Sequence, residues 1–365
     1  MIKIADAEDI MKGSKIKLGL LILLLSLLFI TESSRGAVKG NCSNCHTMHR
    51  SQTAWPWDMN WGGPASDPVE NLLVVDCLGC HTNYTDGAST VELGSGATKS
   101  TVPIVYNVSP PANPLAGGNF YWVAQGDDTK GHNVLGIAGV DTFLSDAPGK
   151  FISCGPSCHA SLAVEQTVQS ELGSGCLGCH LNPKHHADDS NTVVDATGGW
   201  YRFLSGHMSG SNQGVEGIED DDWQSTKSAS DHNEYLGYVG VGGWGFNGLG
   251  HTTTGFCTAC HCNFHASQGS ISPWLMHPSE VVIPDSGEFA DAFGAGGSGT
   301  GTYDPDIPVA RPSLASVSNN VNIDTDQVMC LSCHRSHGSP YSKMLRWDYR
   351  GNDWSGCGSC HTWKQ

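Results

Sequence analysis

Seven short segments of the chain contain two closely spaced Cys residues, the second of which directly precedes a His. Six share the pattern Cys-x-x-Cys-His, and the seventh has one additional residue between its two Cys residues. The Cys residues of these motifs are Cys42, Cys45, Cys77, Cys80, Cys154, Cys158, Cys176, Cys179, Cys257, Cys260, Cys330, Cys333, Cys357 and Cys360. The His residues that close them are His46, His81, His159, His180, His261, His334 and His361. The repetition indicates a chemistry that needs two sulfurs and one imidazole at a fixed spacing.

The pattern Cys-x-x-Cys-His is the attachment signature of c-type haem. Its two sulfurs form thioethers with the haem, and the adjacent His lies under the iron as its proximal ligand. The sequence therefore predicts seven covalently attached haem c groups. Zinc sites also use paired Cys residues, but they do not need a His directly after each pair. A disulfide framework, which is common in exported chains, does not require this spacing either.

One Cys residue lies outside the motifs. Cys262 directly follows His261, the proximal ligand of the fifth motif. A packed free thiol is the simpler interpretation of this residue. An intermolecular disulfide, or a sulfur close to the iron of that haem, is the alternative.

The second axial position of each iron needs a ligand too, and the chain has ten further His residues. Because ten candidates exceed seven positions, every haem can have two His ligands, which favour a lower potential than a Met ligand does. The distal ligands that we expect first are His49, His132, His186, His232, His265, His277 and His337. We rank three candidates behind them, namely His185, His207 and His251, and expect the adjacent His185 and His186 to supply one ligand between them.

Two motifs carry a second His three residues after the proximal one. His49 follows His46 in this way, and His337 follows His334. Residues three apart lie on the same side of a helical turn, so the second His cannot reach the opposite face of the same haem. We expect it to bind the iron of a neighbouring haem, which would hold haems together in close pairs.

The elements that position these ligands are expected to be short. Residues 161–172 have apolar side chains at helical spacing, and residues 102–108 and 120–123 suit short strands. Residues 285–306, rich in Gly and Asp, predict a surface loop. We expect the acidic run 216–222 to be a solvated face, with a cation site or a partner patch as the alternative.

The composition leaves little material for a conventional hydrophobic core. Of the 365 residues, 46 are Gly, and only 15% are charged, which disfavours long amphipathic helices and coiled coils. The fold class that we expect is a multihaem cytochrome c. It would consist mostly of coil and loops with short helices and few short strands, around a core formed by a chain of closely packed haems. The net charge of −17 argues against a nucleic-acid partner.

The N-terminus has the features of a secretory signal. An apolar run over residues 18–30 follows several Lys residues, and small residues surround a cleavage point after Gly36. The run is shorter than the about 20 residues of a membrane span, and no other segment is apolar enough to cross a bilayer. We therefore expect residues 1–36 to be a signal peptide and residues 37–365 to be a single heptahaem unit, secreted to the periplasm or the cell exterior.

Two segments carry a resemblance to a known family. Residues 41–49 read Asn-Cys-Ser-Asn-Cys-His-Thr-Met-His, and the segment from Cys330 begins Cys-Leu-Ser-Cys-His-Arg-Ser-His-Gly-Ser-Pro-Tyr. Together with the other motifs, they resemble multihaem c-type cytochromes of the doubled CXXCH type from metal-reducing bacteria, which include extracellular cytochromes that polymerise into haem-chained filaments. The resemblance implies bis-His haems in a serial chain and electron transfer to acceptors outside the cell.

The function that follows is electron transfer along seven bis-His haems, with no enzymatic turnover. The resemblance implies an extracellular location, and as partners other multihaem cytochromes, extracellular acceptors such as metal oxides, or further copies of the chain in a homopolymer. A soluble periplasmic electron carrier is one alternative. A multihaem reductase with one open haem is another, although the chain has no Cys-x-x-Cys-Lys motif of the kind that often marks such a site.

Overall fold

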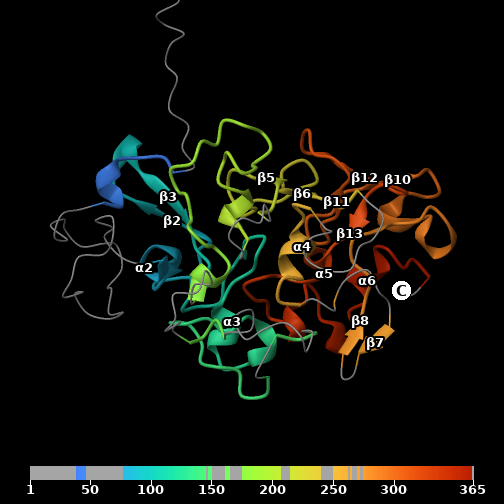
Figure 1. The fold of residues 1–365 in the computed structure, drawn as a ribbon, viewed down its shortest axis with the longest axis horizontal. Coiled ribbons are helices and arrows are strands. Elements are labelled where there is room, and N and C mark those ends of the chain that lie inside the picture. Colours follow the sequence, from blue (N-terminus) through green and yellow to red (C-terminus); the bar gives the residue numbers. More distant parts are fainter. Residues whose placement is uncertain are drawn as a thin grey trace, which may run out of the picture.

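The structure of this protein is a computed structural model. It describes residues 38–46, 77–144, 147–149, 161–164, 175–206, 214–239, 250–261, 264, 269–271 and 274–363. Figure 1 shows short helices and strands joined by long stretches of coil, with residues 77–144 on one side of the molecule and the C-terminal residues on the other. This confirms the predicted fold class of short elements in a chain that is mostly coil.

The described α-helices have only four or five residues each. They are α2 (Cys77–His81), α3 (Tyr121–Ala124), α4 (Thr253–Cys257), α5 (Cys330–Cys333) and α6 (Ser355–Gly358). Single 3₁₀ turns are η1 (Cys42–Asn44), η4 (Gly96–Thr98), η5 (Asp128–Lys130), η7 (Gly175–Gly178), η8 (Tyr201–Phe203), η10 (Gly287–Phe289), η11 (Ala292–Gly294), η12 (Ser342–Met344) and η13 (Tyr349–Gly351). Helices this short are not stable alone, so contacts elsewhere must hold them. None of the helices in these ranges is long and apolar enough to cross a membrane.

The strands are equally short and form one mixed sheet and four two-stranded pairs. They are β1 (Thr82–Asn83), β2 (Thr90–Leu93), β3 (Ser100–Pro103), β4 (Tyr106–Asn107), β5 (Gly217–Ile218), β6 (Glu234–Leu236), β7 (Gly269–Ile271), β8 (Trp274–Met276), β9 (Val281–Val282), β10 (Thr300–Thr302), β11 (Ala310–Arg311), β12 (Asn320–Asn322) and β13 (Gln327–Val328). The five-stranded sheet has the order β5-β6-β11-β13-β9, in which β6 and β11 are parallel. The pairs β2-β3, β7-β8 and β10-β12 are antiparallel, and β1-β4 is parallel.

The apolar core of the described residues consists of three small clusters. The largest lies around the antiparallel pair β10-β12 and includes Ile283, Tyr303 and Val321. A second lies at β6 and β11, around Tyr235 and Ala310, and a third lies at α3. Clusters of three to seven buried residues are small for a chain of this length. The described residues therefore pack in several small cores and not in one continuous core.

Three short elements were predicted. The strand segment is confirmed, the second strand is wrong, and the helix is described only in part. Residues 102–108 contain β4 and the end of β3, as expected of a strand segment. Residues 120–123 were expected to form a strand but instead lie in and next to α3. The side-chain oxygen of Asn119 accepts a hydrogen bond from the amide of Tyr121 at 2.9 Å, which starts a turn there. Of the predicted helix 161–172, residues 161–164 form a turn, and the remainder lies outside the described residues.

The prediction that residues 285–306 form a surface loop is confirmed only in part, because half of these residues are exposed and others lie in the core. They contain η10, η11 and β10, and Ala292 and Tyr303 belong to the largest core cluster. A Cβ atom at Gly301 would lie 2.6 Å from Cβ of Phe293. The Gly residues in this segment therefore include one that permits close packing, whereas the sequence pattern suggested only loops.

The acidic run 216–222 is not simply a solvated face either. Its residues Gly217–Ile218 form β5, and Asp220 is buried, with 7% of its surface exposed. The backbone amide of Gln224 donates to the Asp220 carboxyl at 2.6 Å. Burial, and after it a contact with Asp222, raise the pKa of Asp220 to about 7. Sheet pairing thus draws one carboxyl of the run into the protein.

Candidate haem-binding site

Each described Cys-x-x-Cys-His motif folds as a single helical turn. The backbone amide of the closing His donates to the carbonyl oxygen of the first Cys, at 2.8 Å for His46, His180 and His361 and 3.0 Å for His261 and His334. In the remaining described motif, the same five residues form α2. A turn of this kind places the two Cys residues and the His on one side of the backbone. The local structure therefore presents two sulfurs and one imidazole together, as thioether attachment requires.

Backbone carbonyl groups orient four of the proximal imidazoles. Nδ1 of His81 lies 2.8 Å from the carbonyl oxygen of Pro103, and Nδ1 of His261 lies 2.8 Å from that of Pro148. His180 and His334 have the same contact with the carbonyl oxygens of residues 202 and 343, at 2.9 and 2.8 Å. A proton on Nδ1 leaves the lone pair of Nε2 free for a metal, so these contacts select the ligating tautomer.

Two of these carbonyl groups belong to residues with left-handed backbone geometry. Arg202 has φ of 48° and is followed by Phe203 at 60°, whereas Lys343 has φ of 62° and is followed by Met344 at 56°. Left-handed backbone costs a residue with a side chain about 1–2 kcal/mol. The same device, two successive left-handed residues, thus directs a carbonyl group at a proximal His in both places.

Five proximal His rings each face the ring of a second His. The distances between ring centroids lie between 5.8 and 6.3 Å. The pairs are His46 with His186, His81 with His185, His180 with His337, His261 with His132, and His361 with His277. The ring planes are close to parallel in the His81 pair, at 18°, and perpendicular in the His361 pair, at 90°.

This spacing fits a metal ion between the two rings of each pair. A metal–nitrogen bond of about 2 Å on each side, together with the radius of each imidazole, places the two centroids of a bis-His site about 6 Å apart. Direct stacking contact between imidazoles would bring them closer. The residues that the sequence analysis assigns to haem are therefore arranged at the separation that a haem iron with two axial His ligands needs.

Burial favours the neutral, metal-binding form of six of the ten paired imidazoles. Burial, reinforced by neighbouring His rings, lowers the pKa of His185 and His261 to about 4 and that of His337 to about 3. Burial also lowers the pKa of His81, His132, His180 and His334. The rings thus carry no proton on the nitrogen that a metal would need near neutral pH.

The adjacent residues His185 and His186 face different partners. His185 lies over His81, and His186 lies over His46. We expected one ligand from this dipeptide, and the structure instead presents two rings to two proximal ligands. The arrangement brings the first two sites together on one short segment of chain.

His337 pairs with a distant motif, as its position three residues after His334 predicts. Its ring lies 6.2 Å from that of His180. The same segment also holds a third site, because the carbonyl oxygen of Ser336 lies 2.7 Å from Nδ1 of His132, which faces His261. Residues 334–337 therefore contact three sites.

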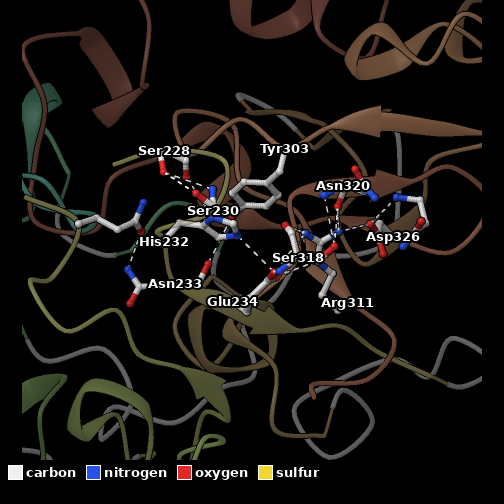
Figure 2. A network of polar contacts seen from close by, with 12 residues as sticks. Ser228, Ser230, His232, Asn233, Glu234, Tyr303, Arg311, Ser318, Asn320 and Asp326 are labelled. Carbon is white, nitrogen blue, oxygen red and sulfur yellow. Dashed lines mark hydrogen bonds and ion pairs between the residues drawn. The ribbon is translucent and has the colours of Figure 1, made fainter. Parts of the chain in front are cut away.

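His232 is placed differently from the other first-choice candidates that the structure describes. Figure 2 shows it in a buried polar network, in which Nδ1 lies 3.2 Å from the Ser228 carbonyl oxygen and Nε2 lies 3.2 Å from Oε1 of Glu234. Its ring stacks on that of Tyr303 at 3.7 Å. Because both nitrogens face oxygen acceptors, neither points a lone pair at a second His. The structure thus does not bring His232 into a pair.

The network around His232 stabilises β6 and β11. Nε of Arg311 donates to Glu234 at 2.8 Å, and its guanidinium also pairs with Asp326. The backbone amide of Ser318 donates to Glu234 at 2.7 Å. Buried charges persist only when they are paired in this way, so a polar role within the protein accounts for His232.

The other candidates are placed as follows. Nδ1 of His251 lies 2.8 Å from the Gly214 carbonyl oxygen, and its ring lies against Trp200.

His334 has no second His ring facing it among the described residues. The expected haem residues outside the described ranges are His49, Cys154, Cys158, His159, His207 and His265, and Cys262 is outside them as well.

Thiols of neighbouring described motifs contact each other in two places. Cys77 and Cys176 hydrogen-bond through their side chains, as do Cys257 and Cys330. Burial, and after it the Cys260 thiol, raise the pKa of Cys179 to about 12, and burial and the Cys360 thiol do the same for Cys333. The described motifs from Cys77 to Cys360 therefore follow one another in space in the same order as in the sequence.

One proximal ligand has a partner that the sequence analysis missed. Oε1 of Glu288 lies 3.2 Å from Nδ1 of His361, where the proximal ligands described above have a backbone carbonyl oxygen. A carboxylate this far along the chain carries no sequence signal for such a role. The backbone carbonyl groups at the other sites could not be found from sequence either, because every residue has one.

Comparison with known proteins agrees with the geometry. Residues 323–365, which include the last two motifs, match the family of the doubled CXXCH motif. The chain is 24% identical to the C-type cytochrome OmcS of Geobacter sulfurreducens over 396 aligned residues, which cover 92% of this chain and 85% of OmcS. Two structures of that organism's outer-membrane cytochrome S filaments, also described as OmcS nanowires, are 18% and 19% identical. Their TM-scores are 0.43 and 0.49, and they cover 86% and 85% of this chain and 84% of each relative.

Proposed function

Since the chain carries a doubled CXXCH motif and resembles multihaem c-type cytochromes, we propose that it is an exported electron-transfer protein that binds seven haem c groups. The haems would be attached at the seven Cys-x-x-Cys-His segments, and each iron would have two axial His ligands. The observation that carries this proposal is the set of five proximal His rings that face a second His ring at 5.8 to 6.3 Å.

The residues of each site have separate tasks. The two Cys residues anchor the haem covalently, and the proximal and distal His hold the iron from both sides. Carbonyl groups such as that of Pro103 keep the proton on Nδ1 and fix the ring orientation. When bound, haem supplies a single iron that alternates between the ferric and ferrous states. A site with both axial positions occupied by protein has no open face for a substrate, so we assign electron transfer and not turnover.

The distal ligands of five sites follow from the observed pairs. The sites of His159 and His334 need two further ligands, for which His49, His207, His251 and His265 remain as candidates. Both members of the dipeptide His185-His186 act as ligands in this proposal. His232 is assigned to the polar network and not to a haem.

The contacts between successive motifs support a serial path. Thioether sulfurs that lie side by side, as at Cys257 and Cys330, would bring the edges of neighbouring porphyrins close to one another. An electron could then pass from haem to haem without a mobile carrier. The core of the molecule would be this row of haems, which explains why the apolar clusters of the described residues are so small.

The similarity to OmcS supports a location outside the cell. We propose that residues 1–36 are removed on export and that the mature chain passes electrons to other multihaem cytochromes or to acceptors such as metal oxides. Because the relative's structures are described as filaments and nanowires, we further propose a homopolymer. Electron microscopy of secreted material separates the polymer from a soluble carrier, since a soluble carrier would leave only dispersed particles.

The proposal is tested by counting haems on the intact mature protein. Mass spectrometry and the pyridine haemochrome assay should both give seven haems per chain, and spectra should show low-spin iron only. Addition of cyanide or nitrite should leave the spectrum unchanged, because no iron has a free position. Fewer than six covalent haems would overturn the assignment, and a high-spin signal that responds to nitrite would indicate a reductase instead.

A further inference from the structure

The C-terminal site differs from four other described sites in what its proximal ligand faces. His81, His180, His261 and His334 direct Nδ1 at neutral carbonyl groups. At His361 the corresponding group is the carboxylate of Glu288, 3.2 Å away. One site of the row thus has a negatively charged partner where four others have an uncharged one.

The position of Glu288 is fixed by its neighbours on both sides. Its own carbonyl oxygen accepts hydrogen bonds from the hydroxyl and the backbone amide of Thr362, at 2.5 and 3.3 Å. The next residue, Phe289, packs its ring against His361 with centroids 5.0 Å apart. The side chains of Glu288 and His361 are 19% and 23% exposed, so water screens their contact only in part. Residues 288 and 289 are therefore held against the last motif by contacts that do not involve the carboxylate.

A carboxylate affects a metal-bound imidazole more strongly than a carbonyl group does. Its full negative charge lies 3.2 Å from Nδ1 of His361, although the two atoms are not aligned for a hydrogen bond, and this charge makes Nε2 a better electron donor. The additional negative charge favours the ferric over the ferrous state. The expected result is a lower reduction potential at this site than at an otherwise similar site with a neutral partner.

The neighbouring site has charges of the opposite sign. Arg346 packs on the motif of His334, where its backbone amide donates to the Cys333 carbonyl at 2.9 Å and its Nε donates to that of Leu331 at 2.6 Å. Positive charge near an iron favours the ferrous state. The residue after Arg346, Trp347, packs its ring against Gly356 in α6, the helix that contains Cys357, so these two sites adjoin.

We propose that Glu288 makes the site of Cys357, Cys360 and His361 the lower-potential member of this adjoining pair, and therefore the end at which electrons enter the row. The inference rests on the proposed haem at that site. A one-electron donor, such as another c-type cytochrome, would reduce the ferric iron held by His361. Transfer of the electron to the site of His334 reoxidises the first iron to the ferric state and reduces the second. No bond is broken, and no proton is needed.

The test is a redox titration of the mature haem-loaded protein and of the variant Glu288→Gln, followed by absorbance and by electron paramagnetic resonance. Gln keeps the size of the side chain and removes its charge. We expect one haem equivalent to move to higher potential while the others stay in place. The resonance signal helps to identify that haem, because perpendicular axial rings such as those of His277 and His361 leave two iron orbitals nearly equal in energy and give an unusually anisotropic signal.

Asp291→Asn is the matched control. Asp291 lies three residues further along the same segment, is exposed, and makes no capping hydrogen bond with its side chain. Its substitution removes the same charge and should leave the titration unchanged. Glu288→Asp, which keeps a charge but shortens the side chain, should give a smaller shift than Glu288→Gln.

Two kinds of failure are distinguishable. If the Glu288→Gln protein carries all its haems and its titration superimposes on that of the unsubstituted protein, the role of Glu288 is wrong and the proposed function stands. An equal shift in Asp291→Asn would also overturn the specific role, because it would show a general charge effect. If mass spectrometry of the unsubstituted protein finds no haem on the peptide with Cys357 and Cys360, the haem assignment itself fails.

Discussion

At the scale of single residues, the decisive feature is the choice of partner for each imidazole. The proximal His residues could be predicted because the two Cys residues that identify them are adjacent in sequence. Their partners could be predicted only as a set. The tertiary fold pairs His180 with His337, and nothing local distinguishes that pairing from others. His232 has the sequence context of a ligand, yet Glu234 two residues away binds its Nε2.

The dipeptide His185-His186 gives the first prediction. His185→Met and His186→Met should each raise the potential of one haem, since a Met ligand favours the ferrous state over a His ligand. The double variant should shift two haem equivalents, because the two rings face different proximal ligands. A redox titration checks this, and Lys184→Gln, on an exposed neighbouring residue, should behave as the unsubstituted protein. A double variant that shifts only one haem would show that the dipeptide serves a single iron.

At the scale of elements, the short turns carry most of the positioning. The motif turns were predictable from sequence, whereas the turns that aim carbonyl groups at them were not. Arg202 and Lys343 have left-handed geometry although Gly or Asn is usual there. Tertiary contacts override local preference at these positions. The same holds for the acidic run 216–222, where pairing of β5 with β6 draws Asp220 inward.

The left-handed backbone at Lys343 predicts opposite changes in stability for two substitutions. Lys343→Gly should stabilise the protein by up to about 1 kcal/mol, because Gly adopts positive φ without strain. Lys343→Val should destabilise it by more than about 1 kcal/mol, since a β-branched residue tolerates this geometry poorly. Thermal unfolding of the haem-loaded protein measures both. Lys99, where φ is −66°, is the control, and there the Val variant should be more stable than the Gly variant. Equal effects of Gly at both positions would contradict the strain argument.

The buried Asp220 predicts a pH dependence of stability. Its pKa is raised to about 7 in the folded protein, whereas an unfolded chain has an Asp pKa of about 3.9. Between these values only the folded protein keeps the proton, so its stability should fall as the pH rises from about 4 to about 7. In Asp220→Asn this fall should be smaller, because Asn remains neutral. Urea unfolding at several pH values tests it, and the exposed Asp221→Asn should retain the full dependence.

At the scale of the whole molecule, the composition and the fold agree. In the described residues the elements are short and the apolar clusters small, so we expect the protein part alone to bury too little apolar surface to offset the conformational entropy of folding. The sequence predicted this deficit and the mostly coil architecture. It could not predict the mixed sheet β5-β6-β11-β13-β9, whose strands have two or three residues each and come from distant segments.

The deficit predicts that the chain depends on haem for its folding. Produced in cells without the machinery for haem attachment, residues 37–365 should show the far-ultraviolet circular dichroism of an unfolded chain and rapid hydrogen exchange throughout. The haem-loaded protein should show protection at the motif turns. A haem-free chain that unfolds cooperatively on heating would contradict this prediction, because it would show that the protein core suffices.

The His pairs also imply an order of events during biosynthesis. A chain that emerges from its N-terminus presents His46, His81 and His180 before it presents their partners His186, His185 and His337. His261 and His361, in contrast, emerge after His132 and His277. Haems attached to the early motifs would therefore wait with one side of the iron uncovered until later segments arrive, whereas the last haem attached finds its second ligand already made. Maturation of the row would be complete only when the C-terminal segment has joined the rest.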